Sequence, residues 1–127
     1  MRGNYQQVPS RDVPALLAGG AALVDVRRPE EWALTGVVAG SHLLTFFDHA
    51  GASRPEVWLR ELNRLVPEDC PLLLICRTGH RTGLVAEYLV DVTTRQEIYN
   101  VSDGIFGWLA TGLPVVSPPA RQAGISL

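Results

Sequence analysis

The sequence predicts an α/β protein in which helices cover both faces of a largely parallel sheet. Apolar segments of strand length, at residues 22–27, 72–75 and 97–101, alternate with segments whose apolar residues repeat at helical spacing. The chain has 127 residues, enough for one domain with a substantial core. We therefore expect one domain over residues 1–127, with a core from about residue 8 to 116 and a loosely ordered tail at 117–127.

The composition is that of an ordinary globular protein, with 46% hydrophobic and 19% charged residues. The formal net charge of −2 gives no electrostatic reason to expect nucleic acid or an acidic membrane surface as a partner. No run approaches the roughly 18 apolar residues that indicate a membrane-spanning helix. Met1–Tyr5 lacks the apolar segment of a secretory signal peptide, so we expect a cytoplasmic protein.

The N-terminal part of the chain is expected to form two short helices and two strands. Ser10 or Asp12 is suited to cap the first helix. Pro29 suits the first turn of the second helix, and the acidic residues after it are favourable at the positive end of the helix dipole. Trp32 and Leu34 are expected to anchor this helix to the core. In chain order the expected elements are a helix around residues 15–17 that ends at 19–20, a strand at 22–27, a helix from 29, a turn at 36–40 and a strand at 41–44.

The rest of the chain is expected to form two longer helices, two strands and a last short helix. Ser53 and Glu56 resemble a capping box. The amphipathic helix behind it has the apolar residues Trp58, Leu59, Leu62, Leu65 and Val66. Another helix is expected from about Thr82, with an apolar stripe formed by Val85, Tyr88, Leu89 and Val92. The remaining expected elements are strands at 72–75 and 97–101, a turn at 102–104 and a helix at 105–110.

The most informative segment is Leu72–Thr82. Four aliphatic residues predict a buried strand, and Cys76 follows directly at its end. In parallel sheets, sites form at the carboxyl ends of the strands. Cations, a glycine and the start of a helix come next, and such surroundings favour the thiolate over the thiol. Cys76 is therefore the candidate catalytic nucleophile.

The six residues after the cysteine are the candidate binding loop: Arg77, Thr78, Gly79, His80, Arg81 and Thr82. If this loop wraps around Cys76, successive main-chain N–H groups point at the sulfur and form an anion nest, to which the helix adds its positive end. Gly79 permits the positive φ that such a turn needs. The two arginines and His80 are expected to add positive potential at the rim. His80 is not expected to act as a general base, because a thiolate that is already ionised needs none.

Asp25 and Arg27 lie two residues apart in an expected strand, so both side chains point to the same face. Burial of a carboxylate costs several kcal/mol unless the group has partners. We expect a structural ion pair or hydrogen-bonded brace near the active loop, with direct contact to the substrate as the alternative. The segment 48–51 either borders the site or is a plain surface loop.

The chain has two cysteines, Cys70 and Cys76, which are too few for a disulfide framework and lack the clustered spacing of a zinc site. Cys70 is expected to be a small, partly buried residue, with a role as a resolving thiol as the alternative. In a reducing compartment Cys76 stays free to react.

Several stretches of the chain resemble the single-domain rhodanese family of sulfurtransferases. They are Leu23–Arg27 with Pro29–Trp32, Cys76–Thr82, and Tyr99–Ile105 with Trp108 and Gly112–Val115. They are similar to the family's D-V-R…E-[WYF] signature, its C-R-[ST]-G-x-R-[ST] active loop and its Y-N-L-x-G-G-I…W…G-[LY]-P-V ending. The match spans about residues 8–116, and the active loop corresponds position for position.

The resemblance implies a three-layer fold with about five strands and an enzyme of the thiosulfate sulfurtransferase type. Cys76 would take the outer sulfur of a small anionic donor such as thiosulfate, and the amides of residues 77–82 would hold the resulting persulfide. A thiophilic acceptor, either cyanide or a thiol that includes the thiol of a protein, would then remove that sulfur. Arg77 and Arg81 would attract the donor, and the Asp25–Arg27 pair would brace the loop from behind. The resemblance implies no metal and no organic cofactor.

Two stretches depart from the family's pattern. Gly36–Ser41 stands where the family has G-H-I-P-G-A, and Asp103–Gly104 stands where it has paired glycines. Both stretches are expected to lie away from the cysteine loop. They should therefore affect substrate preference more than catalysis.

Two other functions compete with sulfur transfer. Cysteine-dependent phosphatases and arsenate reductases carry an arginine six positions after the nucleophile, where this chain has Thr82, with Arg81 one position earlier. Classical tyrosine phosphatases also have histidine where Ile75 stands here. The other alternative is a non-catalytic rhodanese-like module that binds a protein partner. Such modules often lack the cysteine, which is present here with the complete loop.

Overall fold

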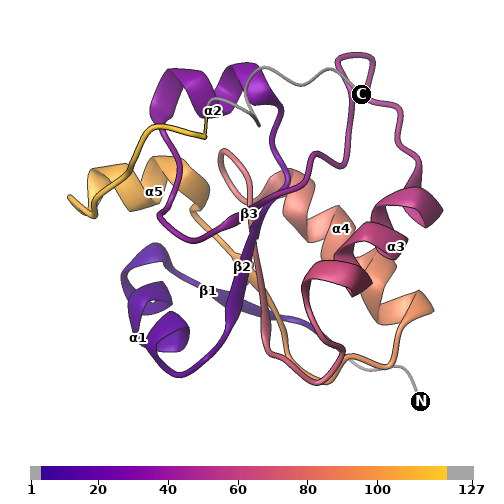
Figure 1. Ribbon diagram of the computed structural model, residues 1–127. Helices are drawn as coiled ribbons and strands as arrows, with labels where there is room; N and C mark the ends of the chain where they lie inside the picture. Colours follow the sequence, from indigo (N-terminus) through magenta and orange to yellow (C-terminus); the bar gives the residue numbers. More distant parts are fainter. Residues whose placement is uncertain (1–3, 120–127) are drawn as a thin grey trace.

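The computed structural model, which describes residues 4–119, is built on one five-stranded sheet (Figure 1). The strands are β1 (Gln6–Val8), β2 (Ala22–Asp25), β3 (His42–Leu43), β4 (Leu72–Ile75) and β5 (Ile98–Val101). They lie in the order β1-β5-β4-β2-β3, and neighbouring strands are parallel throughout. The α/β class and the parallel sheet predicted from the sequence are confirmed.

Helices cover both faces of this sheet. They are the 3₁₀ turn η1 (Ser10–Asp12) and the helices α1 (Val13–Ala18), α2 (Pro29–Thr35), α3 (Pro55–Leu65), α4 (His80–Val92) and α5 (Gly104–Ala110). Leu72 and Leu74 of β4 pack in the core with residues of α3 and α4, whereas Leu73 and Ile75 pack with residues of α1 and α5. Strand β4 is therefore buried on both faces, and Cys76 follows it at the middle of the sheet.

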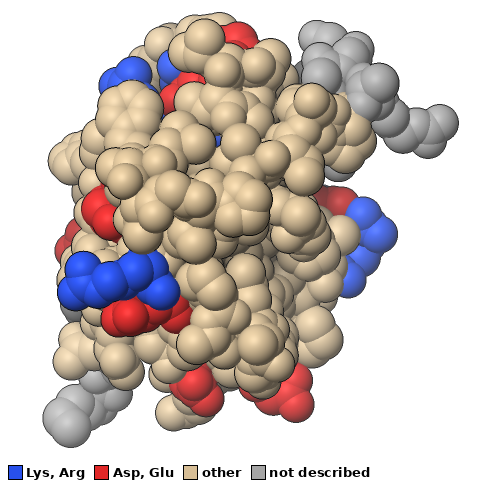
Figure 2. Space-filling model, turned by 90° about the vertical axis from the view of Figure 1, so that its left-hand side faces the viewer, with Lys and Arg blue, Asp and Glu red and all other residues tan. Residues whose placement is uncertain are grey.

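The face of the molecule that carries α1 and α5 has few charged side chains, and these lie mainly toward its edges (Figure 2). On α5, Ile105 and Trp108 are buried in the core. Phe106 and Leu109 of the same helix are exposed. Helix α5 is therefore apolar on its outer surface as well as on its inner one.

Two helices, α2 and α4, differ from the prediction, either in side-chain burial or in where the helix begins. Trp32 is buried as expected, but Leu34 is 85% exposed. Residues two apart on a helix point to nearly opposite sides, so these two side chains cannot both face the core. Helix α4 begins at His80, two residues before the predicted start, and Val92 at its end is exposed rather than buried.

The predicted side-chain caps are not formed. Asp12 at the start of α1 makes no capping hydrogen bond, and the cap position of α3 is Arg54 rather than Ser53. The hydroxyl of Ser10 donates to the carboxylate of Asp103 instead, at 2.7 Å. Each of these helices has a proline in its first turn, where the fixed φ favours helix initiation.

At the two ends of the described chain, the structure has a strand that was not predicted and only part of the predicted tail. Strand β1 is not predicted, because Gln6–Val8 is a short polar segment at the sheet edge and has no apolar run. Val116 pairs with Val37 through two main-chain hydrogen bonds of 2.8 Å each. Of the predicted tail at 117–127, residues 120–127 lie outside the described part. Between residues 4 and 119, no helix has the length and apolar character needed to cross a membrane.

Candidate active site

Cys76 lies at the carboxyl end of β4, where the chain turns sharply into α4. The turn depends on Gly79, which adopts a φ of +95° directly before the helix. A Cβ at this position would overlap the main-chain carbonyl of Ser102, so the loop packs against the end of β5 with no room for a side chain. The local sequence therefore places the start of α4 next to the sulfur of Cys76.

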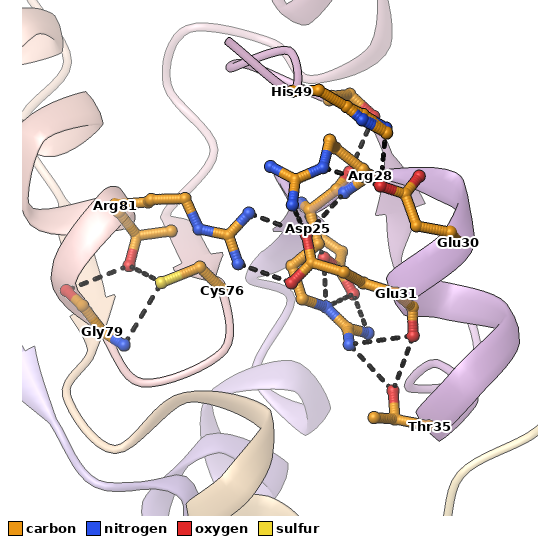
Figure 3. A network of polar contacts seen from close by, with 12 residues as sticks. Asp25, Arg28, Glu30, Glu31, Thr35, His49, Cys76, Gly79 and Arg81 are labelled. Atoms are coloured by element: carbon orange, nitrogen blue, oxygen red, sulfur yellow. Dashed lines mark hydrogen bonds and ion pairs between the residues drawn. The ribbon is translucent and has the colours of Figure 1, made fainter. Parts of the chain in front are cut away.

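The sulfur of Cys76 receives one main-chain hydrogen bond and one hydroxyl contact. The Gly79 N–H donates to Sγ at 3.2 Å, and the Thr82 hydroxyl lies 3.4 Å from Sγ (Figure 3). The cysteine side chain is 1% exposed and forms part of the core on the α4 face. Among the main-chain N–H groups of the described residues, that of Gly79 alone donates to the sulfur. The predicted ring of several amides is thus not closed around a single sulfur atom.

Other amides of the predicted loop lie in the first turn of α4. His80, Arg81 and Thr82 are the first residues of this helix. The first N–H groups of any helix have no acceptor within the helix, and they attract negative charge. Around the sulfur, Arg77, Thr78 and His80 are exposed to solvent, whereas Thr82 is buried.

The start of α5 holds the outer side of the loop. The Ile105 N–H donates to the carbonyl of Cys76 at 2.8 Å, and the Phe106 N–H donates to the carbonyl of Arg77 at 3.1 Å. A Cβ on Gly104 would overlap the carbonyl of Arg77. The expectation that Asp103–Gly104 lies away from the cysteine loop is therefore wrong. The contact of Gly79 with Ser102 and that of Gly104 with Arg77 both join segments distant in the sequence, so no local sequence pattern predicts them.

Asp103 stands where the family pattern has glycine, and its φ of −105° is one that a residue with a side chain adopts readily. Its Oδ1 accepts hydrogen bonds from the main-chain N–H of Ser10 at 2.9 Å and from the Ser10 hydroxyl at 2.7 Å. The Ser10 hydroxyl also lies 3.0 Å from the carbonyl oxygen of Gly104. This departure from the family pattern thus links η1 to the start of α5.

Asn100 of β5 supports the loop and was not among the predicted site residues. Its side-chain amide donates to the carbonyl of Gly79 at 3.0 Å and to the Gln7 side chain at 2.9 Å. Its Oδ1 accepts a hydrogen bond from the Thr82 hydroxyl. Asn100 is only 3% exposed, so these bonds satisfy a buried polar group. The residue fixes both Gly79 and Thr82, the two groups that contact the sulfur.

Asp25 and Arg27 form a buried ion pair, with Nη2 and Oδ2 at 2.8 Å and both side chains 1% exposed. The remaining donors of Arg27 bind α2: Nη1 lies 2.8 Å from the Thr35 hydroxyl, and Nη2 lies 3.1 Å from the carbonyl of Gly36. The pair therefore joins the end of β2 to the end of α2. It makes no direct hydrogen bond to the cysteine loop among the described residues. Neither side chain reaches the solvent.

The structure shows a second ion pair, between Arg81 and Glu31, that the sequence pattern does not predict. The guanidinium of Arg81 donates two parallel hydrogen bonds to the carboxylate, Nη1 to Oε1 at 2.8 Å and Nη2 to Oε2 at 2.7 Å (Figure 3). The Arg28 N–H adds a third hydrogen bond, to Oε1 at 3.1 Å. Burial alone raises the pKa of Glu31, but the hydrogen bonds from Arg81 and from the Arg28 main chain outweigh it and set that pKa at about 2. Arg81 is therefore not the free rim cation that was expected.

Two other predicted features lie at the surface. Arg77 has its guanidinium carbon 5.9 Å from the centroid of the Phe106 ring, and it pairs with no carboxylate among the described residues. Nε2 of His49, in the 48–51 segment, lies 2.9 Å from the carboxylate of Glu30 in α2, and both side chains are exposed. That segment thus contacts α2 rather than Cys76. Cys70 is half-buried, and its thiol donates to the carbonyl of Gly20 at 3.4 Å, as expected of a partly buried filler.

Folding stability should depend on pH through Glu31. Its pKa is about 2 in the folded protein and near 4.5 without partners, so its stabilisation is complete above about pH 4.5 and is lost as the pH falls toward about 2. We expect the difference in free energy of unfolding between wild type and Glu31→Gln, measured with urea, to be widest near neutral pH and to narrow below about pH 4.5. A difference that stays constant down to about pH 3 would contradict this assignment.

The chain matches one family sequence model, and it is similar to named relatives and to solved structures. The sequence model of a family described as Rhodanese-like domain matches residues 11–111. A thiosulfate sulfurtransferase GlpE from Pseudomonas fluorescens is 27% identical over 107 residues, which cover 84% of this chain and 87% of that protein. The GlpE of Pseudomonas syringae is 29% identical, with coverage of 84% and 90%. In structure, Rv0390 from M. tuberculosis is similar with a TM-score of 0.76 and 25% identity, over 91% of this chain and 100% of that chain.

Proposed function

Because this chain belongs to the rhodanese-like domain family, we propose that it is a sulfurtransferase that moves a sulfane sulfur from a donor to a thiophilic acceptor through Cys76. The observation that carries the proposal is the position of Cys76 at the end of the central strand, with the Gly79 N–H on its sulfur and the first turn of α4 beside it. Relatives that are named thiosulfate sulfurtransferases support the same reaction.

The first half of the proposed reaction loads the cysteine. The Cys76 thiolate attacks the outer sulfur of a donor such as thiosulfate, a new S–S bond forms, and the old S–S bond breaks with its electron pair leaving on sulfite. The Gly79 N–H is already directed at the attacking sulfur. The N–H groups in the first turn of α4 are the donors available for the additional, negatively charged outer sulfur.

The second half returns the cysteine to its starting state. Cyanide or a thiolate attacks the outer sulfur of the persulfide, and the S–S bond breaks with its electrons returning to Cys76. With cyanide the product is thiocyanate. A thiol acceptor, free or on a protein, takes the sulfur in the same way. Neither half requires a metal or an organic cofactor, and a reducing compartment such as the cytoplasm keeps the thiol available.

The phosphatase alternative finds less support in the site. A phosphatase needs the fork of an arginine directed at the oxygens of its substrate. Here Arg81 gives both of its parallel hydrogen bonds to Glu31, and the position of the phosphatase arginine is held by Thr82 against the sulfur.

A pair of assays separates the alternatives. We expect the folded protein to form thiocyanate from thiosulfate and cyanide, and to leave p-nitrophenyl phosphate unhydrolysed. Hydrolysis of the phosphate ester without sulfur transfer would favour the phosphatase. Absence of both activities in the folded protein would favour the non-catalytic binding module.

A further inference from the structure

The guanidinium of Arg81 lies near the sulfur of Cys76 (Figure 3), but both of its terminal nitrogens already donate hydrogen bonds to Glu31. Arg81 extends from the first turn of α4 toward α2, and its two parallel hydrogen bonds end on the Glu31 carboxylate (Figure 3). The hydrogen bonds that Arg81 donates to Glu31 raise the pKa of Arg81, and the nearby Cys76 adds a smaller contribution in the same direction. Arg81 is therefore close enough to act on a charge at the sulfur, but it is already paired.

Glu31 is fixed in this position. It occupies the third residue of α2, and the Arg28 N–H donates to the same Oε1 that Arg81 binds. Its side chain is 13% exposed and that of Arg81 is 20% exposed. Since the pKa of Glu31 is about 2, the carboxylate stays ionised at every pH at which a sulfur-transfer assay is run. Both partners of the pair are therefore charged under assay conditions.

A planar arginine fork binds the oxygens of a sulfonate in the geometry it uses for a carboxylate. The sulfonate end of thiosulfate would therefore compete with Glu31 for Arg81 and would meet its negative charge. The other arginines on that side are also paired, Arg27 with Asp25 at 2.8 Å and Arg28 with Glu30 at 2.8 Å. Within residues 4–119, Arg77 is the arginine of the site that has no carboxylate partner.

We infer that Glu31 is a specificity-determining residue, which occupies the Arg81 fork and selects against small dianionic donors in favour of donors that carry less negative charge, such as an organic persulfide R–S–SH. The inference rests on the proposed sulfurtransferase function. With such a donor, the Cys76 thiolate attacks the outer sulfur, the donor S–S bond breaks, and its electron pair leaves on the thiolate R–S⁻. The proton stays on the transferred sulfur.

The test compares Glu31→Gln with Glu30→Gln. Both variants remove one negative charge from the start of α2, but Glu30 pairs with Arg28 and His49 and not with Arg81. In Glu31→Gln we expect the KM for thiosulfate to fall at least about threefold, with kcat changed by less than about twofold. The KM for 2-hydroxyethyl persulfide, a donor whose R group is uncharged, should stay unchanged, and Glu30→Gln should leave both KM values unchanged. A rise in the KM for thiosulfate, or a fall in kcat of more than about twofold, would contradict the inference.

A second readout needs no sulfur transfer. Iodoacetate is an anion and iodoacetamide is neutral, so the ratio of their alkylation rates at Cys76 reports the potential at the sulfur. We expect this ratio to rise in Glu31→Gln and not in Glu30→Gln. If sulfur transfer occurs but neither KM nor the ratio responds to Glu31→Gln, or Glu30→Gln has the same effect, the inference is wrong and the sulfurtransferase proposal stands. If no donor loads the wild type, the proposed function fails, and the alkylation ratio alone decides whether Glu31 keeps anions from the site.

Discussion

Replacement of Cys76 by serine is expected to reduce sulfur transfer from thiosulfate to cyanide to background, a loss on the order of 10³-fold or more. A serine hydroxyl is not ionised near neutral pH and is a poor nucleophile toward sulfur. The substitution changes one atom at a buried position, where the Gly79 N–H and the Thr82 hydroxyl remain as hydrogen-bonding partners. Loss of transfer should therefore occur with the fold intact, as circular dichroism and steady-state thiocyanate formation would show.

The other cysteine supplies the matched control. Cys70 is half-buried in the turn before β4, and its thiol contacts the carbonyl of Gly20 rather than any group of the site. Cys70→Ser should keep full activity. Activity that survives Cys76→Ser but is lost in Cys70→Ser would show that Cys70, and not Cys76, is the nucleophile.

The second large effect is expected for Gly79→Ala. The residue has a φ of +95°, and a Cβ would overlap the Ser102 carbonyl, a main-chain group that cannot swing aside as a side chain does. We expect the free energy of unfolding to fall by at least about 2 kcal/mol. Because the Gly79 N–H donates to Sγ of Cys76, any shift that relieves the overlap also moves that donor, and sulfur transfer should fall with stability.

Gly40→Ala separates the two causes of this effect. Gly40 also has a positive φ, of +81°, but a Cβ there would meet no atom within 4 Å. It should show only the cost of the left-handed backbone, about 1–2 kcal/mol in urea unfolding, with normal transfer activity. Equal losses of stability and activity in the two variants would show that the close approach to Ser102 is unimportant.

The sequence predicts those parts of the molecule that depend on local pattern. The apolar run at Leu72–Ile75 identifies the central strand, and the cysteine that follows it must then lie at the carboxyl end of that strand, where sites form. The two-residue spacing of Asp25 and Arg27 predicts a pair on one face, and the structure contains that ion pair. In each case residues close in sequence determine the result.

Contacts between distant segments could not be predicted in this way. Glu31 and Arg81 are 50 residues apart, and the pattern of α2 indicates only that an acidic residue suits its first turn. Asn100 stands in a buried strand, so its polarity signals that it needs partners, but not that the partners are Gly79 and Thr82. The contact of Gly104 with the cysteine loop likewise depends on how α5 packs.

Intact-protein mass spectrometry after treatment with thiosulfate tests the central claim most directly. If the sulfur of Cys76 is the nucleophile beside the amides of the loop, the wild type should gain one sulfur atom, roughly 32 Da, and should lose it when cyanide is added. Cys76→Ser should show no gain. A folded wild type whose mass does not change, or a Cys76→Ser protein that gains the same mass, would contradict the account.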